Sequence, residues 1–153
     1  MTPHPDFAGL DVPEVLPLGP YLLTMLTGAE LDEDFAAVMG SVTVLRGFFA
    51  PGWPDELTYE DDLTDLHWHH REFTTRRSFA WIIRDDSGVY LGCAYLFPDI
   101  ANTGRGEVVF WFTDTPDRPS HIAAFGPLYH AWWAARLPQG YDLRLSHNAR
   151  LGH

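Results

Sequence analysis

Three histidines lie close together in segment 65–73, which reads DLHWHHREF. On a helix His67 and His70 stand three residues apart, so they can share one face as metal ligands beside a carboxylate such as Asp65 or Glu72. No second group has ligand spacing, because the remaining histidines are scattered along the chain. His70 also falls on an apolar helical stripe, which favours packing. The sequence therefore predicts no metal site.

Two residues are candidates for a general base. His69 neighbours the same stripe, and an imidazole can take up a proton near neutral pH. Glu107 precedes an apolar segment, and a carboxylate beside Val108 and Val109 loses hydration, which favours proton uptake. Each has a structural alternative: His69 packs as a core residue, and Glu107 pairs with Arg105 at the surface.

All ten basic residues are arginine, and the chain contains no lysine. This excludes Schiff-base chemistry, pyridoxal-phosphate chemistry and the lysine of a P-loop. Arg76, Arg77 and Arg84 either bind a phosphate or carboxylate, or offset the ten acidic residues of segment 30–65. Cys93 lies in an apolar segment, which is typical of a buried side chain rather than a nucleophile.

Length and composition narrow the class of protein. A chain of 153 residues with 46% hydrophobic content predicts one domain with its own core. A net charge of −11 argues against nucleic acid or an anionic membrane as partner. A single cysteine cannot form an internal disulfide, and the first 20 residues lack the features of a signal peptide, so we expect a cytoplasmic location. No segment is long and apolar enough to span a bilayer.

A three-stranded antiparallel sheet in segment 78–112 must position these side chains. Residues 79–84 alternate with the period of two that a strand has. Residues 89–97 alternate in the same way and end at Pro98, which has no ladder donor. Residues 108–112 are apolar throughout, as in a central strand covered on both faces.

Helices and shorter strands are predicted on either side of this sheet. Residues 1–20 contain five prolines and no periodicity, which predicts an extended N-terminal arm before a single domain at 21–153. Thr58 and Asp61 have capping-box spacing and begin a helix. Its expected buried stripe is Leu63, Leu66, His70 and Phe73. The other expected elements are a strand at 21–27, a helix at 31–39, helical turns at 42–49, a helix at 121–136 and a strand at 141–145. The helix at 121–136 is expected to bury Ile122, Phe125, Leu128 or Tyr129, and Trp132.

This order of elements resembles the GNAT acyltransferase superfamily. The segment RRSFAWIIRDDSGVYLGCAYLFP, followed by EVVFWF, resembles the second, third and fourth strands of GNAT-like proteins. The similarity spans about residues 21–145. The resemblance implies an α+β fold, with a mixed, mainly antiparallel sheet flanked by helices and shortened at its C-terminal end. It also implies transfer of an acyl group from acetyl-CoA or another acyl-CoA to a small amine, with Glu107 as base and His69 as helper.

The resemblance assigns cofactor contacts to one strand and one helix start. The backbone of Phe110, Trp111 and Phe112 would receive the pantetheine arm. The diphosphate would lie near Arg118, Ser120 and His121, because a helix N-terminus favours anions. The connecting segment TDTPDRPS departs from the glycine-rich family loop, since it has no glycine, two prolines and two aspartates. We therefore expect weak CoA affinity, carried mainly by the strand backbone. The alternatives are a GNAT-fold protein that binds another ligand and an interaction subunit.

We also expect a homodimer. The strand at 141–145 would form an open sheet edge, which needs covering or pairing. Trp132 and Trp133 are adjacent on a helix, so both cannot point into one core. Trp133 is expected to face outward, and the dimer contact is expected to use either the strand at 141–145 or the Trp133 face.

Overall fold

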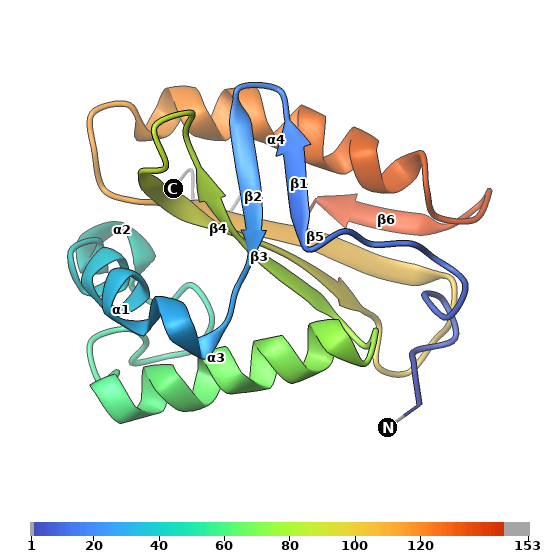
Figure 1. Cartoon of the computed structure of the whole chain (residues 1–153), viewed down its shortest axis with the longest axis horizontal. Coiled ribbons are helices and arrows are strands. Elements are labelled where there is room, and N and C mark those ends of the chain that lie inside the picture. Colours follow the sequence, from blue (N-terminus) through green and yellow to red (C-terminus); the bar gives the residue numbers. More distant parts are fainter. Residues whose placement is uncertain (1, 146–153) are drawn as a thin grey trace.

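The structure, a computed structural model, describes residues 2–145. Six strands in this range form one sheet in which spatial order follows sequence order: β1 (Val15–Leu18), β2 (Tyr21–Met25), β3 (Phe79–Arg84), β4 (Tyr90–Pro98), β5 (Arg105–Phe112) and β6 (Asp142–Leu145). The helices are the 3-10 turn η1 (Gly28–Glu30), α1 (Leu31–Met39), α2 (Val42–Leu45), α3 (Tyr59–Thr74) and α4 (Arg118–Ala134). The predicted α+β class is confirmed, and Figure 1 shows the arrangement.

Strand β5 occupies the interior position that its apolar sequence predicts. Strands β1 to β5 pair antiparallel with their sequence neighbours, and β6 joins β5 in parallel. Strand β4 can lie against β5 because residue 92 is glycine. A Cβ added at Gly92 would stand 1.9 Å from the carbonyl oxygen of Trp111, where no side chain fits.

Helices cover both faces of the sheet (Figure 1). Helix α4 packs on one face, over a core that includes Trp81, Phe110 and Tyr129. Helices α1 and α3 cover the other face, over a second core that includes Leu66 and Trp111. Side chains alternate along β5 between these two cores, so that β5 contributes to both.

Helix α3 begins as predicted. The side chain of Thr58 accepts a hydrogen bond from the backbone N–H of Asp61, and the Asp61 carboxylate accepts one from the backbone N–H of Thr58, which completes the capping box. The predicted buried stripe was wrong in part: His69 is buried, at 7% exposure, whereas His70 and Leu63 are only partly buried. Asp62, on the same side of α3, is also buried and faces α1.

The prediction for the two adjacent tryptophans was also wrong. Trp133 is fully buried and lies against Phe79 and Trp81, with ring centroids 5.4 and 6.0 Å apart. Trp132 is the partly exposed member, and the guanidinium of Arg136 lies 4.0 Å above its ring. Any contact by a tryptophan at this end of α4 would therefore use Trp132 and not Trp133.

The segment expected to be an extended arm contributes to the core. Strand β1 lies within it, and Phe7 is fully buried against Phe79, with ring centroids 5.3 Å apart. Within residues 2–145, no helix has the length and apolar character needed to cross a membrane.

Candidate active site

His69 lies in the wall between α3 and the sheet. Its ring stands 5.4 Å from that of Tyr95 and 6.5 Å from that of Phe97, both on β4. Its Nε2 is 3.4 Å from Oδ2 of Asp65, one helical turn earlier. Its Nδ1 is buried and has no hydrogen-bond partner among the described residues. The imidazole is thus held on one side by a carboxylate and unsatisfied on the other.

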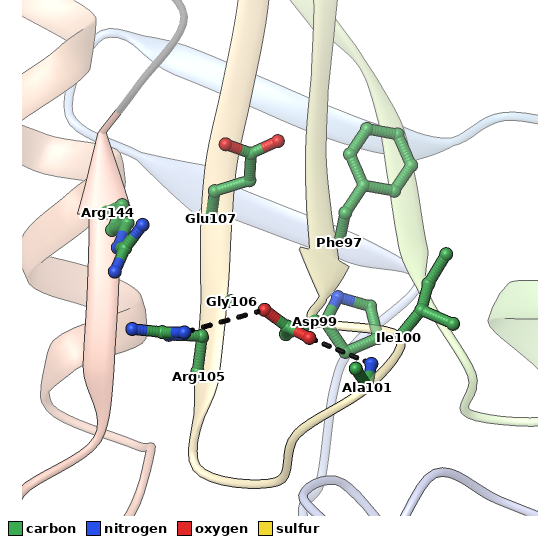
Figure 2. Close-up of a pocket in the computed structure, with 9 residues that line it drawn as sticks. Phe97, Asp99, Ile100, Ala101, Arg105, Gly106, Glu107 and Arg144 are labelled. Atoms are coloured by element: carbon green, nitrogen blue, oxygen red, sulfur yellow. Dashed lines mark hydrogen bonds and ion pairs between the residues drawn. The ribbon is translucent and has the colours of Figure 1, made fainter.

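Glu107 lines a hollow of about 340 Å³ at the start of β5 (Figure 2). Its Cα neighbours are Phe97 on β4 and Arg144 on β6, and all three side chains line the hollow. Arg105, on the same face, lies 3.3 Å from Asp142 and 4.0 Å from Asp99. Glu107 is therefore a half-buried carboxylate in a hollow that also holds two guanidinium groups.

The two candidate bases lie on the same face of the sheet. Phe97 lines both the hollow beside Glu107 and a cavity beside His69. Side chains of β5 alternate, so Glu107 shares its face with Trp111, whose core lies under α3. The structure thus brings both residues to the α3 side of β4 and β5, with Phe97 common to their surroundings.

The side chains of the expected pantetheine strand belong to the core. Phe110, Trp111 and Phe112 are each at most 1% exposed, backbone and side chain together, so a ligand would have to displace neighbouring groups to reach this strand. In the described residues, the pairing of β6 with β5 ends at Leu145 and Val108. The last four residues of β5 thus extend past the described part of β6 toward the start of α4.

Arg118 connects the end of β5 to the first turn of α4. Its Nε donates a hydrogen bond to the carbonyl oxygen of Phe112, at 3.1 Å. Its Nη2 is buried and has no hydrogen-bond partner among the described residues. Burial lowers the pKa of the guanidinium, and Asp114 opposes this in part. An anion beside Nη2 would satisfy this donor and stabilise its charge.

The other two residues expected at the helix start differ in their surroundings. Ser120 is exposed. His121 stacks on Phe112 with ring centroids 5.2 Å apart, and its Nδ1 lies 2.9 Å from the hydroxyl of Tyr21. His121 is therefore positioned mainly by packing against the sheet.

A buried acidic pair under α1 and α3 was not anticipated. Asp34 and Asp62 are 4% and 3% exposed, and burial next to Asp34 raises the pKa of Asp62 to about 9. The hydroxyl of Tyr90 donates to Oδ1 of Asp34 and lies 2.9 Å from Sγ of Cys93. One signal was available: Asp62 precedes the buried Leu66 by four residues and so lies on the same stripe.

The remaining polar candidates have structural roles. Burial raises the pKa of the Cys93 thiol, which keeps it protonated, as expected for a buried side chain. Arg84 binds Glu33 through two contacts of 2.8 Å, and Arg77 lies 3.7 Å from Glu72. Within residues 2–145, no three histidine, cysteine or acidic side chains gather as a metal site would require.

Solved structures share this arrangement of helices and strands. One is RimL, a ribosomal alpha-N-protein acetyltransferase in complex with coenzyme A. The match covers 80% of this chain and 67% of the RimL chain, with a TM-score of 0.65 and 11% identity. RimJ of Mycobacterium smegmatis, in complex with a CoA disulfide, matches 80% of this chain and 63% of its own, with a TM-score of 0.60 and 15% identity. A candidate ribosomal-protein-serine acetyltransferase from Vibrio cholerae matches 84% of this chain and 64% of its own, with a TM-score of 0.56 and 13% identity.

The chain has the GNAT fold. It matches no family model and no curated protein sequence. The chain spans about two thirds of the length of these GNAT-fold structures. At these identities the likeness establishes the fold alone.

The residues that the GNAT resemblance assigns to CoA fit it in part. The unpartnered Nη2 of Arg118 suits a phosphate, and the end of β5 has no pairing with the described part of β6, although Phe110, Trp111 and Phe112 are buried there. The first turn of α4 offers less than a glycine-rich loop would. The N–H of Arg118 already donates to Thr115, Pro119 has none, and the N–H of His121 donates to Asp117. The strand and Arg118 would therefore carry most of the binding.

Proposed function

We propose that this GNAT-fold chain is an N-acyltransferase that uses acetyl-CoA or another acyl-CoA and acylates an amine. The observation that carries the proposal is the buried, unpartnered Nη2 of Arg118 between the end of β5 and the start of α4. An orphan guanidinium donor is costly, and a bound phosphate would remove that cost. Two GNAT-fold proteins with similar structures, RimL and RimJ, are described in complex with CoA or its disulfide.

The bound cofactor would supply an acyl group activated as a thioester. The backbone of Phe110, Trp111 and Phe112 would hold the pantetheine arm, and Arg118 with the first turn of α4, at Ser120 and His121, would hold the diphosphate end. Phe97 and Trp111 keep the α3 side of the strand apolar, which limits water near the reacting groups.

Glu107 is the proposed general base. An amine must lose a proton to become a nucleophile, and a carboxylate in a hollow on the central strand can accept it. Arg105 and Arg144 line the same hollow. His69 has a supporting role, because Asp65 orients its ring and leaves Nδ1 as the second acceptor on this face.

A second candidate is a GNAT-fold protein that binds a ligand without acyl transfer. The observation in its favour is the segment before α4, where Pro119 removes a donor and Asp114 and Asp117 would repel a diphosphate. Each aspartate would oppose a bound phosphate by about 1 kcal/mol at partly screened range. An interaction subunit remains the third alternative.

An assay of thiol release decides between these candidates. The full chain is mixed with acetyl-CoA and a panel of primary amines, and free CoA is followed with a thiol reagent. The acyltransferase proposal predicts release that needs both the amine and the protein and that falls in the Glu107→Gln variant. Glu60→Gln, an exposed glutamate on α3, is the matched control. Release at the uncatalysed rate with every amine would favour the ligand-binding alternative.

A further inference from the structure

A cavity of about 380 Å³ lies beside His69, between α3, the segment 49–57 and the end of β4. Four aromatic side chains line it: Phe49, Trp53, Trp68 and Phe97. Phe49 and Trp68 are 43% and 42% exposed, although both are large and apolar. The rings of Phe49 and Trp53 lie 4.8 Å apart at 76°, in an edge-to-face contact. The face of an exposed aromatic ring attracts a cation.

The charges at this cavity are negative. Asp61 and Asp65 line it, one helical turn apart on α3, and no arginine within residues 2–145 does. The surrounding segment 30–65 carries ten acidic residues and a single arginine, Arg46. That arginine is already bound by Asp55 through contacts of 2.8 and 2.9 Å. The cavity therefore attracts a cation and repels an anion or a carboxylate.

His69 provides an observation independent of the aromatic rings and the acids. It lines the cavity, is only 7% exposed, and has a buried Nδ1 with no hydrogen-bond partner in residues 2–145. With Nε2 beside the Asp65 carboxylate, the proton belongs on Nε2, which leaves Nδ1 as an acceptor. A buried acceptor without a hydrogen-bond donor costs free energy. A ligand that carries an N–H or O–H group would supply the donor that Nδ1 of His69 lacks.

We infer that this cavity binds a primary alkylammonium group carried by the acceptor. The aromatic faces and the two carboxylates select positive charge, and Nδ1 of His69 selects a cation that carries an N–H. This inference rests on the proposed acyl transfer for the identity of the ligand as the acceptor. The binding itself requires no cofactor.

The side chain of Trp68 controls the access of a ligand to His69. Its half-exposed indole packs edge-on against the imidazole, with ring centroids 5.0 Å apart, and Nδ1 is shielded from solvent. An ammonium that reaches Nδ1 must displace this indole. Binding therefore changes the surroundings of Trp68 more than those of Trp132, which lies under Arg136 on α4.

Nuclear magnetic resonance titration of the full chain, without acyl-CoA, tests the site. The probes are n-butylammonium, its uncharged counterpart n-butanol, and tetramethylammonium, which has no N–H. The indole N–H resonance of Trp68, assigned with a Trp68→Phe variant, should shift saturably with n-butylammonium while that of Trp132 stays in place. Tetramethylammonium should bind at least threefold more weakly and n-butanol at least tenfold more weakly.

Charge variants complete the test. Asp65→Asn should weaken n-butylammonium binding at least tenfold, because it removes a carboxylate at the cavity and the partner of His69. Asp65 is 58% exposed, so the fold should persist, as circular dichroism would verify. Glu60→Gln removes one charge from the same helix outside the cavity and should have less than a twofold effect.

Equal binding of n-butanol and n-butylammonium, or an Asp65→Asn variant that binds as the parent does, would overturn the inference. A Trp68 resonance that does not move with any probe would also overturn it. Ammonium binding without thiol release in the acyl-transfer assay would leave the cation site intact and refute the proposed function instead.

Discussion

The buried Asp34 and Asp62 pair makes a testable prediction for stability against pH. The side chains are 4% and 3% exposed, and burial together with the neighbouring Asp34 raises the pKa of Asp62 to about 9. In the unfolded chain an aspartate has a pKa of about 3.9. Between these values the folded protein holds a proton on Asp62 that the unfolded chain has released.

The sign of the effect follows from this difference. A folded-state pKa above the unfolded value contributes stability that is complete below the unfolded pKa and is lost as pH rises toward the folded pKa. One extra proton in the folded state lowers the free energy of unfolding by about 1.4 kcal/mol per pH unit. Between pH 5 and pH 8 the loss would reach about 4 kcal/mol if no other group compensated.

Asp62→Asn isolates this contribution, because the amide has nearly the same shape and releases no proton. The free energy of unfolding of Asp62→Asn minus that of the parent should rise by about 1.4 kcal/mol per pH unit from pH 5 to pH 8. Urea unfolding followed by tryptophan fluorescence at four pH values measures it. Asp86→Asn, an exposed aspartate in the turn before β4, should give a flat difference. Parallel stability curves for the parent and Asp62→Asn would refute the buried, protonated state.

The remaining predictions concern catalysis, packing and assembly. Glu107→Gln should lower kcat by about a hundredfold with an unchanged melting temperature, and His69→Ala should lower it less; full activity in the first variant would remove the named base. Trp133→Ala should cost about 3–5 kcal/mol in urea unfolding and Trp132→Ala much less, because only Trp133 is fully buried; equal losses would contradict that assignment. We also propose a homodimer through the edge strand β6, which light scattering on a sizing column would test; a 17.3 kDa particle at tens of micromolar protein would contradict it.

Much of the fold was predictable because the period of the side chains is strong in the sheet. The alternation in residues 79–84 and the apolar run ending at Phe112 predicted β3 and β5, and both were confirmed. The capping spacing of Thr58 and Asp61 was also sufficient, because the two side chains satisfy each other locally. Local signals were reliable where the interaction itself was local.

Tertiary contacts decided the positions that were missed. His69 and His70 are adjacent and similar, so only the packing of α3 against Tyr95 selects which one is buried. Asp62 lies in the first turn of α3, where the helix dipole alone explains an acidic residue, and its pairing with α1 is not visible in the sequence. The aromatic cavity depends on the irregular segment 49–57, which has no period to interpret.

Binding of acetyl-CoA to the full chain tests the central claim most directly. Isothermal titration calorimetry should give saturable binding with a micromolar Kd, since the strand backbone and one arginine replace a glycine-rich loop. Arg118→Ala should weaken it about tenfold, or about 1.4 kcal/mol, and Arg136→Ala, at the other end of α4, should leave it unchanged. No heat at millimolar acetyl-CoA would contradict the acyltransferase proposal, and submicromolar affinity abolished by Arg118→Ala would contradict the weak-loop interpretation.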